Sequence, residues 1–551
     1  MRANLIILIA ILAILASAAG VAGVASATGA PTAANATTLT RAPYLQLGTD
    51  HSITIRWRTD GPTDSCVSFG PSPTNLTDST TLPDSTIEHE VLLEELNADT
   101  IYYYSIGSST ELLAGADPDH WFLTAPATGT DTPTRVWVLG DSGTADASAR
   151  AVRDAYLAYT GSVHTDLWLM LGDNAYDSGT DLEYQAAVFD TYPTMLRKSV
   201  LWPTLGNHDA VSTDPDTQTG PYYDIFTLPT AGEAGGVPSQ TEAYYSFDYA
   251  NIHFICLESS ETDLSPQGAM FTWLAQDLAG TSATGAAWII AFWHYPPYSR
   301  GSHDSDTNWH MTKMRENAVP ILEAGGVDLV LSGHSHSYER SYLIDGHYGL
   351  AVSFEPSMLV DSGDGRFASD GPYRKAPGGP VPHAGTVYMV AGSSGLTGGG
   401  SFDHPVMYTS MNSLGSVVMD FGNQELYVRF IDTGGFLRDF FSIRKSEPAT
   451  DGPATVSFTP GPGLRQIRPN PFNPLTAISF EIDTSAEVQI RVFDLRGRRV
   501  ADIARRWFPA GAHEVTWDGT DDHGAAVASG AYLVEMTAPG VRDLRKATLV
   551  R

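Results

Sequence analysis

Five apolar segments in the middle of the chain each end in side chains that can bind a metal ion. VWVL, LWLML, LWPTL, WIIAFW and VDLVL have the composition of buried strands. The polar residues that follow them are Asp141, Asp173 with Tyr176, Asn207 with His208, His294, and His334 with His336. In open α/β sheets, sites form beyond the carboxyl ends of the strands, so five such ends can place these groups in one crevice.

Each of these residues also has a purely structural interpretation. Asp141 could cap the following helix, and Asp173 and Asn207 could form Asx turns after glycine. His294 could be a hydrogen-bonded core histidine. Singly, the two interpretations weigh about equally. Jointly they do not, because five independent strand ends would have to select Asp, Asp, Asn, His and His by accident.

The surrounding sequence predicts three globular parts. RVWVLGDSG and the helical pattern at 145–159 begin an α/β domain that continues to about Arg444. Before it, alternating segments such as SITIRWR, together with the tyrosine-corner spacing that ends at Tyr102, predict a small β-sandwich. After it, short strands separated by turn residues predict a third unit, which is all β.

The motifs GDSG, GDNAY, GNHD, the His294 segment and GHSHSYER occur in this order. Together they resemble the calcineurin-like metallophosphoesterases and specifically the purple acid phosphatases, over roughly residues 42–430. We therefore expect a multidomain chain. Its N-terminal part, 41–127, would be a fibronectin type III-like β-sandwich, and its central part, 134–445, an α/β metallophosphoesterase with an αββα sandwich. Its C-terminal part, 464–551, would be an Ig-like β-sandwich.

The resemblance implies two metal sites that share one carboxylate. The first ion would be bound by Asp141, Asp173, Tyr176 and His336, and the second by Asp173, Asn207, His294 and His334. Carboxylate and phenolate oxygens suit Fe(III), whereas an amide oxygen and two imidazoles suit a divalent ion. The expected cofactors are Fe(III) plus one divalent metal, namely Zn, Fe or Mn.

The resemblance also assigns roles to two further histidines. Two metal ions about 3.5–4 Å apart can hold a phosphate ester and provide the attacking hydroxide. His208, beside Asn207, would protonate the leaving alkoxide as general acid, and Asp209 is expected to steer His208 by hydrogen bonding. His303, nine residues beyond His294, would face the substrate; the alternative is a solvated loop histidine.

These expectations describe a secreted acid phosphatase that hydrolyses phosphate monoesters. A phosphodiesterase or nucleotidase acting at the same site is one alternative. A surface-binding protein with a vestigial metal site is another, which the complete ligand set disfavours. The net charge of −31, from 63 acidic against 32 basic residues, disfavours nucleic acid binding as the main function. Small phosphate esters are the expected partners.

Both ends of the chain carry targeting patterns. Residues 1–27 have the basic start, apolar run and small residues of a secretory signal peptide, with an uncleaved membrane anchor as the alternative. Residues 28–40 and 446–463 have the composition of linkers. Residues 464–551 resemble the C-terminal sorting modules of type IX bacterial secretion, which implies export through the periplasm to the surface or medium by that machinery. A sugar- or surface-binding accessory module is the alternative.

Overall fold

The computed structural model describes residues 37–281, 285–366, 370–422, 424–445, 463–482, 485–494, 498–539 and 541–551. The chain divides into two units, Met1–Thr37 and Thr38–Arg551. The expected signal peptide at 1–27 and nearly all of the expected linkers at 28–40 and 446–463 lie outside the described residues. Within the described ranges, no helix is both long and apolar enough to cross a membrane.

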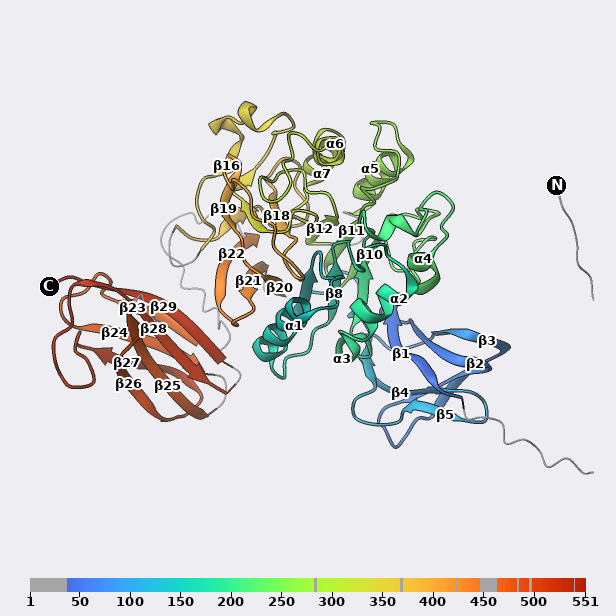
Figure 1. Cartoon of the computed structure of the whole chain (residues 1–551), viewed down its shortest axis with the longest axis horizontal. Helices are drawn as coiled ribbons and strands as arrows, with labels where there is room; N and C mark the ends of the chain where they lie inside the picture. The colour runs from blue at the N-terminus through green and yellow to red at the C-terminus, as the bar shows by residue number, and fades with distance from the viewer. Residues whose placement is uncertain are drawn as a thin grey trace, which may run out of the picture. The chain divides into compact units, whose positions relative to one another are not determined.

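The N-terminal β domain is confirmed (Figure 1). Six strands form it. These are β1 (Leu39–Gln46), β2 (Ile53–Gly70), β3 (Asp78–Leu93), β4 (Ile101–Gly107), β5 (Leu112–Gly115) and β6 (Trp121–Leu123). All six belong to one hydrogen-bonded sheet, because β2 pairs with β1 through its first half and with β4 through its second half. The Tyr102 hydroxyl accepts a hydrogen bond from the Asn97 backbone N–H at 3.0 Å, which closes the corner that the sequence spacing predicts.

Two seven-stranded sheets form the central domain. The first runs in the order β10 (Tyr245–Tyr249), β11 (Ile252–Cys256), β12 (Trp288–Trp293), β13 (Leu329–Ser332), β18 (Val387–Ala391), β14 (Tyr338–Ser341) and β19 (Met407–Met411). The second runs in the order β17 (Tyr373–Lys375), β22 (Leu437–Lys445), β21 (Glu425–Asp432), β20 (Gly415–Gly422), β7 (Thr134–Leu139), β8 (Leu167–Met170) and β9 (Val200–Pro203). The strands β11, β12 and β13 are parallel, as are β7, β8 and β9. Parallel strands point their carboxyl ends to the same edge of a sheet.

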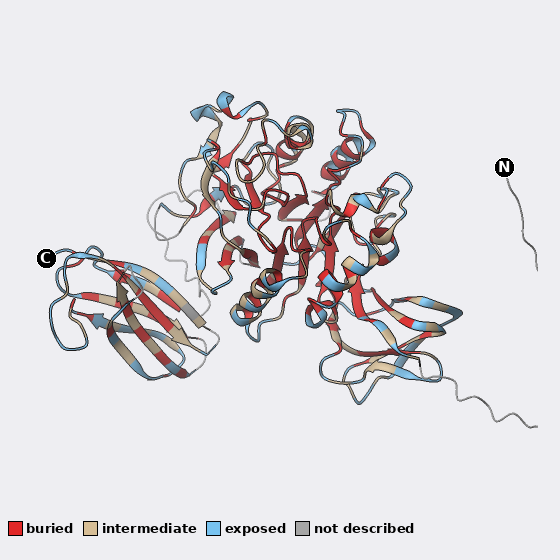
Figure 2. Cartoon of the chain, viewed as in Figure 1, coloured by how far each residue is buried: buried red, intermediate tan, exposed pale blue. Residues whose placement is uncertain are grey.

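Aromatic side chains join the two sheets face to face. Trp202 of β9 stacks on Phe247 of β10 with ring centroids 3.8 Å apart, and Tyr338 of β14 stacks on Phe430 of β21 at 4.1 Å. The central strands of both sheets are buried along their length (Figure 2). Burial on both faces explains why their sequences are continuous apolar runs rather than alternating ones.

Helices cover the outer faces of the sheets. In α1 (Ala147–Thr160), Tyr156 stacks on Trp137 of β7 at 4.2 Å. In α5 (Ala269–Thr281), the Asp277 carboxylate lies 2.8 Å from Nε2 of His253 in β11. The shorter elements are α2 (Asp181–Tyr184), α3 (Pro193–Leu196), α4 (Pro221–Ile225), α6 (Trp309–Lys313), α7 (Val319–Gly325), β15 (Leu343–Ile344) and β16 (Leu359–Asp361). The packing of α1 and α5 gives the helix–sheet–sheet–helix order.

Arginines of the N-terminal β domain bind the start of α2 in the central domain. Arg41 Nη2 lies 2.8 Å from Asp181 Oδ1, and Arg58 Nη1 lies 2.6 Å from Asp181 Oδ2. The hydrogen bond from Arg58 is the largest influence on the pKa of Asp181, which falls to about 2. The N-terminal β domain thereby anchors the polypeptide that immediately follows Tyr176, one of the expected metal ligands.

The C-terminal domain has two sheets and a core of its own. One sheet contains β23 (Gly463–Arg468), β24 (Thr476–Ile482) and β27 (Gly511–Trp517), and the other contains β26 (Arg499–Phe508), β25 (Ala486–Asp494), β28 (Gly530–Ala538) and β29 (Val541–Leu549). Their inward-facing residues, such as Phe480, Val492 and Trp517, form an apolar cluster separate from that of the rest of the chain. The all-β prediction for this part is therefore correct.

Candidate metal centre

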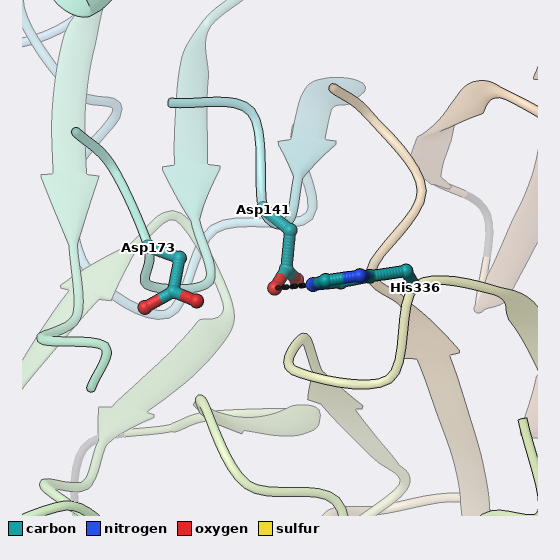
Figure 3. A group of neighbouring side chains, drawn as sticks. All are labelled: Asp141, Asp173 and His336. Atoms are coloured by element: carbon teal, nitrogen blue, oxygen red, sulfur yellow. Dashed lines mark ion pairs between the residues drawn. The ribbon is translucent and has the colours of Figure 1, made fainter. Parts of the chain in front are cut away.

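The residues that follow five buried strands come together, as the order of strands and loops predicts. Asp141, Asp173 and Asn207 follow β7, β8 and β9 of the second sheet, whereas His294 and His334 follow β12 and β13 of the first. The edge where the two sheets meet therefore receives ligands from both. Figure 3 shows Asp141, Asp173 and His336 gathered there. One potential ligand atom from each lies within 4.8 Å of the others.

The first group of potential ligands surrounds the Asp141 carboxylate. His336 Nε2 lies 3.5 Å from Asp141 Oδ1, and the Tyr176 hydroxyl lies 3.3 Å from the same oxygen. The hydroxyl also donates to Asp173 Oδ2 at 3.0 Å. Two carboxylates, a phenol and an imidazole therefore converge, which is the donor set expected for the first ion.

The second group surrounds the Asn207 amide oxygen. That oxygen lies 3.0 Å from His294 Nε2 and 3.0 Å from His334 Nδ1. His294 directs its other ring nitrogen, Nδ1, to the Leu171 carbonyl at 2.8 Å, which leaves Nε2 available as a ligand. Asp173 Oδ1 lies 3.5 Å from His294 Nε2, whereas its Oδ2 faces Tyr176. One carboxylate thus presents an oxygen to each group.

The charge balance of these groups fits bound cations. Asp141 is 0% and Asp173 1% exposed, and no lysine or arginine in the described part of the chain pairs with either. Burial opposes ionisation of Asp173, but the nearby His294 outweighs it and holds the pKa of Asp173 at about 2. Burial and the two carboxylates raise the pKa of Tyr176. Buried carboxylates need positive charge nearby, and two metal ions would supply it.

The backbone at the site excludes some of the structural interpretations. Asp141 does not cap α1, because the Asp146 side chain accepts hydrogen bonds from Ser148 N and Ala149 N instead. Asp141, Asp173 and His334 have φ angles of 55°, 51° and 63°. Residues other than glycine pay about 1–3 kcal/mol for this left-handed conformation. The surrounding fold therefore imposes it where the side chains must converge.

Glycine is required where two of the loops meet. A Cβ atom on Gly206 would lie 2.1 Å from the Asp173 backbone nitrogen and 2.3 Å from its Oδ1. Those distances are far inside van der Waals contact, so no other residue fits at position 206. The glycine of the GNHD motif thus lets the loop after β9 approach the shared carboxylate.

His208 lies beside the two groups of ligands. Its backbone N–H donates to Asp173 Oδ1 at 2.9 Å, and its ring Nδ1 lies 2.7 Å from the Asp177 carbonyl oxygen. A carbonyl can only accept, so Nδ1 carries the hydrogen and Nε2 is the nitrogen left for a substrate. The ring also contacts that of Tyr176, with centroids 4.5 Å apart.

Asp209 differs from the expectation that it steers His208. Its buried carboxylate accepts hydrogen bonds from Asn174 N at 3.1 Å, Gly206 N at 2.9 Å and the Tyr184 hydroxyl at 2.6 Å. Asp209 therefore ties the loop after β8 to the loop after β9, and the Asp177 carbonyl positions the His208 ring. Proximity in sequence suggested a contact that the fold does not make.

His303 reaches the site from the loop after β12. Its ring centroid lies 4.0 Å from that of His334 and 6.0 Å from that of His336, and the residue is half-buried. It therefore does not fit the alternative of a solvated loop histidine. The neighbouring Ser302 hydroxyl accepts a hydrogen bond from the His336 backbone N–H at 2.8 Å, which fixes the two histidine loops to each other.

Serine hydroxyls support these loops, and sequence reasoning did not single them out. Glu339 Oε1 accepts from Ser299 Oγ at 2.5 Å and from Ser337 Oγ at 3.0 Å, and Ser335 Oγ lies 2.8 Å from Ser299 Oγ. The only signal was the alternation of serine with histidine in SGHSHS. This network connects the loop of His303 to the loop of His334 and His336.

Three parts of the chain match known families. Residues 41–124 match "Purple acid Phosphatase, N-terminal domain", residues 134–338 match "Calcineurin-like phosphoesterase", and residues 472–540 match "FlgD Ig-like domain". The first two matches together span the N-terminal β domain and the five strand ends that carry the candidate ligands.

Several relatives of the chain are purple acid phosphatases from plants. Purple acid phosphatase 18 of Arabidopsis thaliana is 28% identical over 313 residues, which cover 54% of this chain and 65% of the relative. Purple acid phosphatase 1 of Ipomoea batatas is 30% identical over 264 residues, covering 46% and 51%. Fe(3+)-Zn(2+) purple acid phosphatase 12 of Arabidopsis thaliana is 28% identical over 262 residues, covering 46% and 52%. The chain thus spans about half to two thirds of the length of these relatives.

Solved structures share the fold. A purple acid phosphatase from yellow lupin (Lupinus luteus) seeds superposes with a TM-score of 0.58 at 17% identity, covering 74% of this chain and 75% of that one. Together with the family matches, this supports a metal-dependent phosphoesterase of the calcineurin-like class. Within that class, the chain is similar to the purple acid phosphatases.

The number of metal ions bound per chain should depend on Asp173. It should not depend on Asp166, the carboxylate at the other end of β8. A neutral amide cannot bridge two cations as a carboxylate does, so Asp173→Asn should lower the content from two ions per chain to fewer than one. Elemental analysis of the purified proteins measures this. Asp166→Asn is the matched control, because Asp166 precedes β8 and, among the described residues, its carboxylate accepts only from Arg135 N and the Tyr249 hydroxyl. Two ions retained by Asp173→Asn would contradict the shared ligand.

Proposed function

We propose that the protein is a secreted acid phosphatase that hydrolyses phosphate monoesters at a centre of two metal ions. The observation that carries this proposal is the position of Asp173, whose buried carboxylate presents one oxygen to each of two groups of ligand atoms. A two-metal centre of this kind suits in-line displacement at phosphorus. Similarity to plant purple acid phosphatases over the same region supports the reaction class.

The donor atoms favour Fe(III) in the first group and a divalent ion, Zn, Fe or Mn, in the second. The carboxylates and the Tyr176 phenol are hard oxygen donors, whereas the second group offers two imidazoles and an amide. A relative that is named for Fe(3+) and Zn(2+) supports this pairing. When bound, the ions would supply Lewis-acid activation of the ester and of the attacking water.

The chain itself would supply the proton and part of the substrate binding. His208 Nε2 would give a proton to the leaving alkoxide, because Nδ1 is already committed to the Asp177 carbonyl. His303, in ring contact with His334, would hydrogen-bond the phosphate from the side of the second group. Both side chains are half-buried, so solvent and substrate can reach them.

A phosphodiesterase or nucleotidase is the alternative reaction at the same centre, and the preferred ester distinguishes it from a monoesterase. A surface-binding protein with a vestigial site is disfavoured, because all seven expected ligands are present and their donor groups converge in two clusters. We would expect a vestigial site to have lost at least one of them.

The first ion should reveal itself by colour. A Tyr176 phenolate bound to Fe(III) should absorb visible light by charge transfer, so the purified protein should be violet. Tyr176→Phe should lose the band and remain folded, because the Tyr176 hydroxyl contacts only candidate ligands in the described structure. An absorption spectrum combined with iron analysis tests this. A colourless but active wild type would assign the first group to another metal.

Replacement of His208 should slow the reaction according to the leaving group. We expect His208→Ala to lower kcat by roughly 10²–10⁴-fold for alkyl phosphates and far less for activated aryl phosphates, whose leaving groups need no proton. Steady-state kinetics on both kinds of ester measure the difference. His383→Ala is the control, because His383 is exposed and pairs with Asp345 away from the candidate ligands. His303→Ala should mainly raise KM.

An equal loss on both kinds of ester would remove His208 from the role of general acid. An unchanged KM for every ester tested with His303→Ala would place His303 outside the substrate pocket.

We further propose that the C-terminal domain directs export by a type IX route, and that residues 1–27 direct the chain to the periplasm first. The C-terminal domain contributes none of the candidate ligands, and its apolar cluster is separate from that of the catalytic region. A domain that takes no part in the active site is better suited to act as a sorting signal than as a structural part of the enzyme. The accessory-binding module remains the alternative role for it.

Removal of residues 464–551 should abolish export and leave catalysis intact. In the native bacterium the truncated chain should collect in the periplasm with the specific activity of the full-length protein. Cell fractionation followed by a phosphatase assay measures both quantities. Continued export would favour the accessory-binding role, and loss of activity in the purified truncated chain would show that the C-terminal domain is structurally part of the enzyme.

A further inference from the structure

A row of aromatic rings leads from the second group of ligands toward the surface. The Tyr295 ring centroid lies 4.1 Å from that of His334, and His310 stacks on Tyr295 at 4.6 Å with an interplanar angle of 18°. Trp309 then meets His310 edge to face at 4.9 Å. We call Tyr295, His310 and Trp309 the aromatic ladder.

Exposure increases along the aromatic ladder. His334 and Tyr295 are each 6% exposed, His310 is half-buried, and Trp309 is 57% exposed. The rings therefore do not form a closed core, in which the largest side chain would be the most deeply buried. A large apolar ring left in solvent costs hydrophobic free energy, part of which a stacked ligand would recover.

The hydroxyl of Tyr295 and the indole N–H of Trp309 are also available. Among the described residues, none hydrogen-bonds to the Tyr295 hydroxyl or to the Trp309 indole N–H. Tyr295 directly follows His294, so the backbone that delivers a candidate metal ligand also places the first ring. Trp309 begins α6, whose cap is the Asn308 side chain, which accepts from Met311 N at 3.2 Å. The last ring is thus held on an ordered turn.

We infer that the aromatic ladder binds the leaving group of the phosphate ester and favours leaving groups that carry a flat aromatic ring, which stacks on Trp309. This inference rests on the proposed phosphatase function. Trp309 is three ring contacts away from His334, so a leaving group must extend beyond the first carbons of the ester to reach it. A nucleoside monophosphate meets this requirement, because its ribose separates the phosphate from a planar base.

Two substrates with the same reacting atoms test the inference. Adenosine 5′-monophosphate and ribose 5-phosphate both release a primary alkoxide, and the nucleotide carries adenine where ribose 5-phosphate has its anomeric hydroxyl. The metal-loaded wild-type protein should have the higher kcat/KM on the nucleotide. Trp309→Ala should reduce that advantage by about 10-fold, which is the usual size of one base–aromatic stacking contact, and should leave ribose 5-phosphate unchanged. Trp309→Phe, which keeps an aromatic face, should retain most of the advantage.

Trp507→Ala is the matched control, because Trp507 is 68% exposed in the C-terminal domain, and it should alter neither substrate. Equal rates on the two substrates in the wild type, or an advantage that Trp309→Ala leaves intact, would overturn the inference while the phosphatase function stands. Hydrolysis of neither substrate would overturn the phosphatase function and the inference with it. Thermal unfolding should be unchanged in Trp309→Ala, since the side chain is largely in solvent.

Discussion

The site depends on two buried carboxylates that pair with no lysine or arginine among the described residues. Asp141 and Asp173 are almost fully enclosed, and the groups around them are a phenol, an amide and imidazoles rather than lysine or arginine. Such an arrangement is unfavourable unless cations complete it. The left-handed backbone at Asp141, Asp173 and His334 adds a further cost that the rest of the fold must offset.

The two sheets offset that cost by fixing the strand ends. Continuous apolar strands pack face to face, so the positions where β8 and β12 stop are set by the core rather than by the loops. Asp209 then ties the loops after β8 and β9 together, and Glu339 does the same for the loops after β12 and β13 through serine hydroxyls. The ligands lie on short loops that are held at both ends.

The parts that sequence predicted are those with local signals. Apolar runs that end in Asp, Asn or His identify the strand ends, and turn spacing identifies the all-β C-terminal domain. The role of Asp209 was not predictable, because its partners Asn174 and Tyr184 are brought to it only by the folded loop after β8. The N-terminal β domain was predicted, but the pairing of β2 with both β1 and β4 was not, because that pairing depends on strand length and long-range register.

The aromatic ladder was missed for the same reason, since nothing in the sequence shows that Tyr295 and His310 stack. The arrangement of its rings nevertheless distinguishes substitutions that reach the metal centre from substitutions that do not. His334 is in ring contact with both His303 and Tyr295, so a substitution at either ring reaches a candidate metal ligand directly. Trp309 makes its ring contact with His310 and is mostly in solvent. Selectivity for the leaving group can therefore vary at Trp309 without disturbing the metal centre, whereas variation at Tyr295 would alter both.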